Sequence, residues 1–138
     1  LWNKTAPKVI AAVIRTLFNG WITSRRFPGA AVSGRCMLGC EAPDSIEHYT
    51  NCSVISAFAR SRLRIERATT PGARLAGFLV LDVPYRRAKE EVDRLRRQAI
   101  RTAVVYQLHN RWRHTRMSAA TAAEALEQIG KELIASSS

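Results

Sequence analysis

The sequence predicts a mainly α-helical fold, a small helical domain organised around one cluster of metal-ligand residue types, with a long basic helix. Apolar residues recur three and four positions apart over several stretches, which is typical of helices with one buried face. All three cysteines lie between residues 36 and 52, together with a histidine. A Thr-Thr-Pro-Gly run at 69–72 interrupts the helical pattern. We therefore expect a metal-binding lobe at 1–67, a linker at 68–72 and a helical lobe at 73–138.

The first helix is expected from about residue 7 to residue 19, with Thr5 as its cap and Gly20 as its stop. It carries an apolar stripe formed by Val9, Ile10, Val13, Ile14, Leu17 and Phe18. The stripe predicts packing on a core and is too short to span a bilayer. Residues 21–35 are expected to be extended, with a turn at 28–29. Trp21 and Phe27 either contact unpaired bases or cover the metal-binding lobe, and their sequence context leaves both interpretations open.

The histidine and the cysteines follow the spacing C-x3-C-x7-H-x3-C, formed by Cys36, Cys40, His48 and Cys52. Two close cysteines supply one half of a tetrahedral site, and a His/Cys pair four residues apart supplies the other half. We expect Asp44 to begin a helix in a capping box with Glu47. That helix would carry His48 in its first turn and Cys52 in its second, both on one face.

This ligand set predicts a closed structural site with Zn²⁺ as the cofactor, because three thiolates and one imidazole are typical zinc ligands. Gly39 allows the backbone to bend between the first two ligands. A disulfide would leave the third cysteine without a partner. A catalytic zinc would need an open position for water, and a Cys/His nucleophile pair would need a thiol that no metal occupies. These three alternatives are weaker than structural zinc.

Three further helices are expected after the linker. The first starts at Thr70 and Pro71 and runs to about residue 81. The longest runs from about residue 84 to residue 117, with an apolar stripe and arginines on its outer faces. The last is capped by Ser118 and runs to about residue 134.

Two histidines, His109 and His114, lie on the long helix but are not spaced for one helical face. No carboxylate neighbours them in the sequence, so we expect no second metal site. We expect a partly buried His109 and a His114 that faces solvent or phosphate.

The chain has a formal net charge of +11, from 22 lysines and arginines against 11 aspartates and glutamates. Most of the basic residues are arginines, whose planar guanidinium suits phosphate groups and stacked bases. This predicts a polyanionic partner, with RNA preferred to DNA and an anionic membrane surface less favoured. Specific reading of duplex DNA is weaker still, because the long helix shows no base-reading register. The arginines expected to contact nucleic acid are Arg25, Arg26, Arg35, Arg60, Arg62, Arg64, Arg67, Arg94, Arg97, Arg101, Arg111, Arg113 and Arg116.

Catalytic motifs are missing from the sequence. It has no glycine-rich phosphate loop, no G-x-S-x-G, no H-E-x-x-H, and no acidic pair in an apolar strand. We therefore expect no enzymatic activity from this chain. Three cysteines that one metal can employ fit a reducing compartment, so an intracellular location is expected, without a transmembrane segment. Because the chain begins with Leu1, we expect an excised domain or a processed mature form.

The metal-ligand stretch resembles the zinc-binding region near the C-terminus of reverse transcriptases from non-LTR retrotransposons. That family has a C-x2-C or C-x3-C knuckle, a short acidic loop, and a helix that begins E-H-x3-C or E-H-x4-C. The matching residues are Cys36, Cys40, Glu47, His48 and Cys52. The lead-in at 19–27 is similar as well, whereas the resemblance along the long helix is looser. The x3 spacing of the first cysteine pair departs from the commoner x2.

The resemblance implies an all-helical module around one zinc ion that holds template RNA or target DNA near a polymerase. The catalytic aspartate motif of the polymerase is absent from the chain. The chain would then be a fragment of a polyprotein, in the nucleus or cytoplasm, or a module taken over for another role. The alternative is a structural subunit of a large ribonucleoprotein assembly, such as the ribosome of the mitochondrion.

Overall fold

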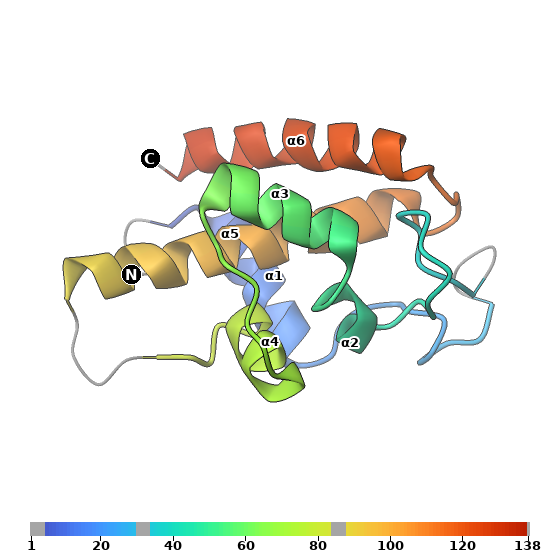
Figure 1. Cartoon of the computed structure of the whole chain (residues 1–138), viewed down its shortest axis with the longest axis horizontal. Coiled ribbons are helices and arrows are strands. Elements are labelled where there is room, and N and C mark those ends of the chain that lie inside the picture. Colours follow the sequence, from blue (N-terminus) through green and yellow to red (C-terminus); the bar gives the residue numbers. More distant parts are fainter. Residues whose placement is uncertain (1–4, 30–33, 84–87, 138) are drawn as a thin grey trace.

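The computed structural model describes residues 5–29, 34–83 and 88–137, which fold into six helices and no β-strand (Figure 1). The helices are α1 (Pro7–Leu17), α2 (Ile46–Tyr49), α3 (Ser53–Leu63), α4 (Pro71–Phe78), α5 (Lys89–Trp112) and α6 (Ala119–Ser136). The mainly helical class predicted from the sequence is confirmed. No helix in the described ranges has both the length and the apolar character needed to cross a membrane.

The central element is α5, which contacts α1, α3, α4 and α6. In Figure 1, α6 and α3 lie above α5, and α1 and α4 lie below it. Because neighbours cover several of its sides, α5 buries a broad face that includes the fully buried Ala99, Ala103, Val104 and Leu108. The buried side chains of the helices join in one hydrophobic cluster.

The helix starts at α4 and α6 follow the sequence prediction. Thr70 accepts a hydrogen bond from the backbone N–H of Ala73 (3.2 Å), and Ser118 accepts one from Thr121 (3.2 Å). The predicted cap of the first helix is wrong, because Ala6 and not Thr5 occupies the N-cap position of α1, and an alanine side chain cannot accept a hydrogen bond. A side-chain hydroxyl at the N-cap satisfies an otherwise unpaired N–H, which explains why the two Ser/Thr caps could be recognised locally.

The predicted apolar stripe of α1 is only partly buried. Val9 and Val13 face the core, whereas Ile14, Leu17 and Phe18 are 47%, 42% and 82% exposed. Thr16 takes a place in the core instead. Its hydroxyl donates to the carbonyl of Ala12 (2.7 Å) and accepts from the Trp21 indole N–H (2.9 Å). The hydroxyl is fully paired, which removes the cost of burying it.

The helix predicted to carry both His48 and Cys52 is broken into two. Ser45, not Asp44, is the N-cap of α2, and its hydroxyl accepts from the N–H of His48 (3.2 Å). The chain leaves the helical conformation after Thr50, and Cys52 is the extended N-cap of α3. His48 and Cys52 therefore lie on different helices, and the predicted shared face is wrong.

The long basic helix is shorter than predicted. It spans Lys89–Trp112 rather than 84–117, and residues 84–87 lie outside the described residues. The segment after α5 turns back toward the cysteine-rich loop, where the N–H of Met117 bonds to the carbonyl of Met37 (2.8 Å). The helix after Thr70 also ends early, at Phe78, and Val80 has a positive φ of 57°.

Candidate metal centre

The structure brings the four predicted ligands together from three separate elements. Cys36 and Cys40 lie on the loop before α2, His48 lies on α2, and Cys52 precedes α3. Their ligand atoms all lie within 4.8 Å of one another. Cys36 and Cys52 are fully buried, and Cys40 and His48 are partly buried. The four side chains therefore form a compact cluster that could hold a metal ion.

The cluster geometry fits a tetrahedral ion. Thiolates bound at about 2.3 Å in a tetrahedron lie about 3.8 Å apart. The Sγ atoms of Cys40 and Cys52 are 3.6 Å apart. Nε2 of His48 is buried and has no hydrogen-bond partner among the described residues. A buried ring nitrogen without a partner is expected at a position where a metal supplies the missing bond.

The loop that carries the first two cysteines is held by its own backbone. The N–H of Cys36 donates to the carbonyl of Ala42 (2.8 Å), next to an antiparallel bridge between Arg35 and Pro43. Gly39 has a positive φ of 91°, as its predicted bend requires. A Cβ atom there would lie 3.0 Å from the carbonyl oxygen of Met117. The loop is therefore packed tightly against the connection between α5 and α6.

Arg116 stabilises the contact between the cysteine loop and the connection from α5 to α6. Its Nη2 donates to Glu41 Oε1 (2.5 Å) and to the carbonyls of Gly39 (3.4 Å) and Cys40 (3.3 Å). The same ion pair is the largest cause that lowers the pKa of Glu41. The structure thus uses a predicted nucleic-acid-binding arginine to hold the cysteine loop.

The thiols of the cluster share their protons unequally. A hydrogen bond with Cys36 is the largest cause that lowers the pKa of Cys52, and the same bond raises the pKa of Cys36. Without a metal, the cluster therefore favours one thiolate, at Cys52. Binding a divalent ion would deprotonate the other thiols, since the thiolate is the form that binds metal.

A buried polar network beside the metal-ligand cluster was not foreseen from the sequence. Asp44 Oδ1 accepts hydrogen bonds from the Tyr49 hydroxyl (2.5 Å) and His109 Nε2 (3.1 Å), and Oδ2 accepts from the N–H of Ser24 (2.6 Å). Burial raises the pKa of Asp44, but the three hydrogen bonds together hold it below its ordinary value. Burial, followed by the carboxylate, raises the pKa of Tyr49.

The Asp44 network joins α5 to the segment that carries the metal ligands. His109 is 1% exposed and meets a carboxylate 65 residues away in the chain. The prediction of a partly buried His109 is therefore wrong, because the side chain is fully buried against a carboxylate that is distant in the sequence, whereas His114 is exposed as predicted. No spacing rule could have paired Asp44 with His109, because the contact depends on how the helices pack.

The two aromatic residues of the lead-in have different positions. Trp21 is fully buried, and its ring lies 5.3 Å from His109, 5.5 Å from Tyr106 and 5.8 Å from Tyr49. Phe27 is 45% exposed, with the Arg26 guanidinium 5.0 Å from its ring centre. Trp21 is a core residue, and of these two aromatic residues only Phe27 is open to a ligand.

Six of the predicted nucleic-acid-binding arginines form ion pairs with carboxylates. They are Arg25 with Glu47, Arg35 and Arg116 with Glu41, Arg60 with Glu66, Arg62 with Glu127, and Arg94 with Asp82 and Glu91. Such surface pairs stabilise a protein by only about 0–1 kcal/mol each. They nevertheless reduce the positive charge that these side chains offer to a polyanion.

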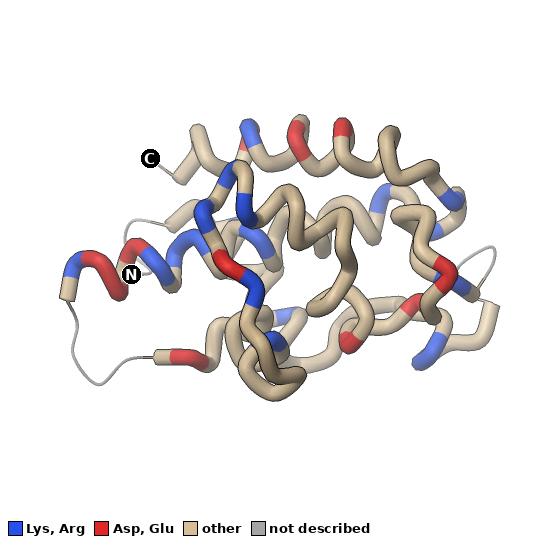
Figure 2. Tube along the Cα trace, viewed as in Figure 1, with Lys and Arg blue, Asp and Glu red and all other residues tan. Residues whose placement is uncertain are grey.

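The other seven predicted arginines have no ion pair within the described residues: Arg26, Arg64, Arg67, Arg97, Arg101, Arg111 and Arg113. Basic residues concentrate at the C-terminal end of α3, the first half of α5 carries both basic and acidic residues, and α6 carries several acidic residues (Figure 2). Arg62, Arg96 and Arg97 line one groove between α3 and α5, together with Asp93. Arg67, Arg74 and Arg101 line a second pocket nearby.

No family model, curated protein or solved structure matches the chain.

Proposed function

We propose that this chain is a non-catalytic nucleic-acid-binding module, stabilised by one structural zinc ion and preferring RNA to duplex DNA. The observation that carries the proposal is the closed cluster of three thiols and one imidazole within a strongly basic helical scaffold. All four ligand positions belong to protein side chains, so no open position remains for a reacting water. The zinc ion positions the scaffold, and the arginines bind the polyanion.

Zinc is the proposed metal because three soft thiolates in a tetrahedral set favour it over magnesium or calcium, which take oxygen ligands. Three thiolates and one divalent ion carry a formal charge of −1 together, so the metal centre itself is a poor receptor for phosphate. One zinc per chain in metal analysis of the purified protein supports this assignment. A metal-free chain with the same thermal midpoint would contradict it.

The RNA preference is supported by exposed aromatic and guanidinium groups at two places, the C-terminal end of α1 and residues 26–27. Phe18 is 82% exposed, and Phe27 is partly exposed beside Arg26. Rings and guanidinium planes of this kind stack on unpaired bases, which are available in single-stranded RNA and not inside a duplex. The proposed origin, a module derived from a retrotransposon reverse transcriptase, agrees with an RNA partner in the nucleus or cytoplasm.

The test is a fluorescence-anisotropy titration of a single-stranded RNA and of a duplex DNA over a series of salt concentrations. Each phosphate contact adds about 0.7 to the log–log salt slope for a single strand and about 0.9 for a duplex. Arg64→Gln removes an exposed arginine that forms no ion pair with any described residue, and it should lower the RNA slope by about one contact. Lys131→Gln removes an equal charge from the exposed side of α6 and should leave the slope nearly unchanged. A flat salt profile for the unmodified chain would exclude the proposed function.

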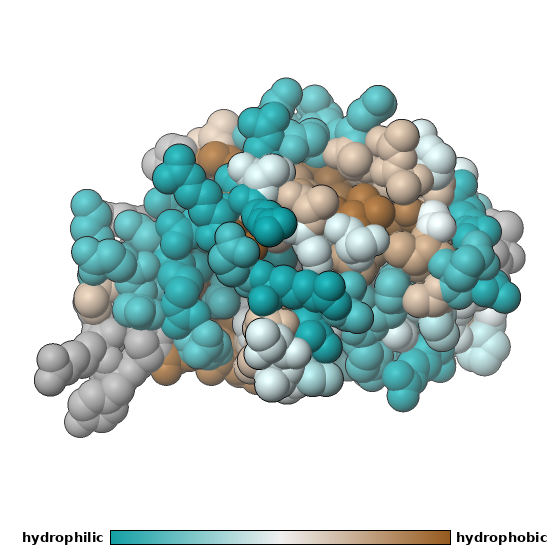
Figure 3. Space-filling view, viewed as in Figure 1, coloured by the Kyte–Doolittle hydropathy of each residue, from teal (hydrophilic) through white to brown (hydrophobic). Residues whose placement is uncertain are grey.

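A second candidate is a structural subunit of a large ribonucleoprotein assembly, such as a mitochondrial ribosome. Apolar surface on two sides of the molecule favours it. Ile14 and Leu17 are exposed on α1, and Phe18 is exposed directly after it. An apolar groove lined by Val54, Ala57 and Phe58 opens between α3 and α6 (Figure 3). Co-purification with ribosomal RNA and ribosomal proteins would support this candidate, whereas isolation as a free RNA-binding protein would favour the first.

A further inference from the structure

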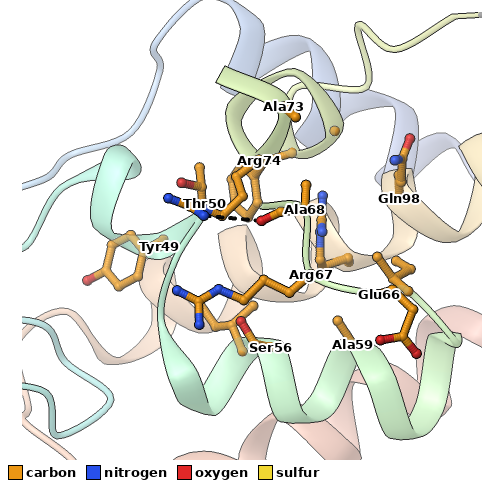
Figure 4. Close-up of a pocket in the computed structure, with 15 residues that line it drawn as sticks. Tyr49, Thr50, Ser56, Ala59, Glu66, Arg67, Ala68, Ala73, Arg74 and Gln98 are labelled. Atoms are coloured by element: carbon orange, nitrogen blue, oxygen red, sulfur yellow. Dashed lines mark hydrogen bonds between the residues drawn. The ribbon is translucent and has the colours of Figure 1, made fainter. Parts of the chain in front are cut away.

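A small pocket lies where α3, the segment 65–68, α4 and α5 meet (Figure 4). Its lining includes Tyr49 and Phe78 and the arginines Arg67, Arg74 and Arg101. We call it the Arg101 pocket. Its cavity volume is about 50 Å³.

The three guanidinium groups of the Arg101 pocket have neutral partners or none. Arg67 donates to the side-chain oxygen of Asn51, and Arg74 donates to the carbonyls of Ala68 and Thr69 (3.1 Å each). Within the described residues, no carboxylate forms an ion pair with any of the three arginines. The pocket therefore gathers three positive charges without a counter-ion.

The acidic residue of the pocket does not supply that counter-ion. Glu66 lines the pocket, but its side chain is 81% exposed and pairs with Arg60 at 3.7 Å. Its charge is directed to the surface, where solvent screens it. The excess of positive charge inside the pocket remains.

Arg101 is the most constrained of the three arginines. Its Nε and Nη2 are buried and have no hydrogen-bond partner among the described residues. Its guanidinium carbon lies 5.4 Å from the centre of the Phe78 ring, which covers one face of the planar group and leaves its N–H edges unpaired. Burial lowers the pKa of Arg101 to about 10, so the group is still a cation at neutral pH. Arg101 as a whole is partly buried, but buried donor atoms of a cation without partners are costly unless an anion accepts them.

A second unpaired polar group lines the same pocket. Gln98 on α5 is 7% exposed, and its Oε1 has no partner within the described residues (Figure 4). Its amide nitrogen lies on the side of Gly77, as does Arg101 Nη2. The unpaired donors of Arg101 indicate an anion in the cavity, whereas the Gln98 oxygen is an acceptor and needs a donor, such as a water molecule or the P–OH of a protonated phosphate.

We propose that the Arg101 pocket binds a single phosphate group, held by Arg67, Arg74 and Arg101. A volume of about 50 Å³ accommodates about three to five water-sized groups at 10–15 Å³ each, which matches the five heavy atoms of one phosphate. Planar guanidinium forks bind the oxygens of such a group in pairs. The phosphate belongs either to a nucleic acid, in which case the inference rests on the proposed function, or to a free phosphorylated molecule.

The test uses the full chain with inorganic phosphate as the probe, measured by isothermal titration calorimetry and by thermal unfolding. Sodium chloride at matched ionic strength is the reference. Phosphate should bind with one site per chain and should raise the unfolding midpoint above that in chloride. Equal midpoints in phosphate and chloride, together with no heat of binding, would overturn the proposal.

Substitutions assign the binding to the pocket. Arg67→Gln removes an exposed arginine, so the fold should survive, and phosphate affinity should fall roughly ten- to a hundredfold. Arg101→Lys keeps the charge but loses the planar fork, and it should also weaken binding. Lys131→Gln, an equal loss of charge on α6, should not change the affinity. Equal weakening by Lys131→Gln and Arg67→Gln would show a diffuse charge effect and overturn the assigned site.

A competition experiment identifies the source of the phosphate and separates this inference from the proposed function. If inorganic phosphate displaces a bound oligoribonucleotide and Arg67→Gln weakens both ligands, the pocket binds a phosphate of RNA. If phosphate binds at one site but the chain binds no RNA, the pocket binds a free phosphorylated molecule and the proposed function is wrong. If RNA binds but inorganic phosphate does not, the proposed function stands and the phosphate pocket is overturned.

Discussion

Asp44 is the residue whose replacement tests the packing around the metal-ligand cluster most directly. Asp44→Ala would remove the acceptor of three hydrogen bonds, which are donated by the Ser24 N–H, the Tyr49 hydroxyl and His109 Nε2. Each unsatisfied buried donor lowers the free energy of unfolding by about 1–3 kcal/mol. Removing the buried carboxylate also removes its desolvation penalty, which offsets part of that loss. We expect a loss of about 3–5 kcal/mol in the free energy of unfolding, which is the range for breaking a buried charged pair.

Asp44→Asn is the matched variant, because it keeps the shape of the side chain and one carbonyl oxygen. That oxygen can still accept from Tyr49 and His109, but the amide NH₂ then faces the N–H of Ser24. One pair of donors is left facing each other, so the expected loss is smaller, about 1–3 kcal/mol. The loss in the free energy of unfolding should therefore be larger for Asp44→Ala than for Asp44→Asn, because the alanine variant loses more hydrogen-bond acceptors.

The pH dependence of stability provides a second measurement on Asp44. Its pKa is lower in the folded chain than in the unfolded chain, so the ionised carboxylate favours the folded state. That contribution is fully present above the unfolded pKa of about 3.9 and is lost as the pH falls through the lower folded value. The difference in stability between the unmodified chain and Asp44→Asn should therefore shrink in acid.

Urea denaturation followed by circular dichroism gives these free energies, with bound metal measured in each sample because acid also protonates the thiols. A loss below about 1 kcal/mol for Asp44→Ala at neutral pH would refute the role of the network. So would a difference between the unmodified chain and Asp44→Asn that stays constant from neutral pH into acid.

Four further predictions test the site and the core. Cys52→Ala should abolish tight zinc binding and lower the thermal midpoint sharply, since structural zinc contributes about 10 kcal/mol or more of folding energy; an unchanged midpoint would refute the metal role. Gly39→Ala combines a positive φ with a 3.0 Å approach to Met117, so urea denaturation should show a loss of about 1–3 kcal/mol. Trp21→Phe removes buried volume and a hydrogen bond to Thr16 and should cost about 2–4 kcal/mol by the same assay. Phe18→Ser should change stability by less than about 0.5 kcal/mol, because Phe18 is largely exposed, but should weaken RNA binding in anisotropy titrations.

The ligand set was accessible from the sequence because metal sites of this kind use short, regular spacings. Cys36 and Cys40 are close in the chain, and so are His48 and Cys52, so each half of the site is a local feature. The prediction of one helix beneath the second half was wrong, because the Asp44 carboxylate accepts hydrogen bonds from other elements, Ser45 caps α2 instead, and the chain turns again before Cys52. The ligands nevertheless meet, since a loop and a helix start can present two side chains as well as one helical face.

The ion pairs of the arginines, in contrast, could not be predicted from the sequence. Their number predicted a polyanionic partner, but the sequence could not tell which of them were already paired. Arg62 pairs with Glu127 from α6, and Arg116 pairs with Glu41 from the cysteine loop. Both partners are far away in the chain, so the charge that remains available depends on the packing of the helices.

The sequence by itself determined the helical class, the caps at Thr70 and Ser118, and the four residues of the metal-ligand cluster. Each of these depends on interactions within a few residues: the period of a helix, a side chain that caps a free N–H, and a ligand spacing. The tertiary structure alone decided that Asp44 would meet His109 and that Trp21 would be buried. The partners of a buried polar or aromatic group come from the elements that pack around it, and these contacts between distant segments cannot be predicted from local sequence spacing.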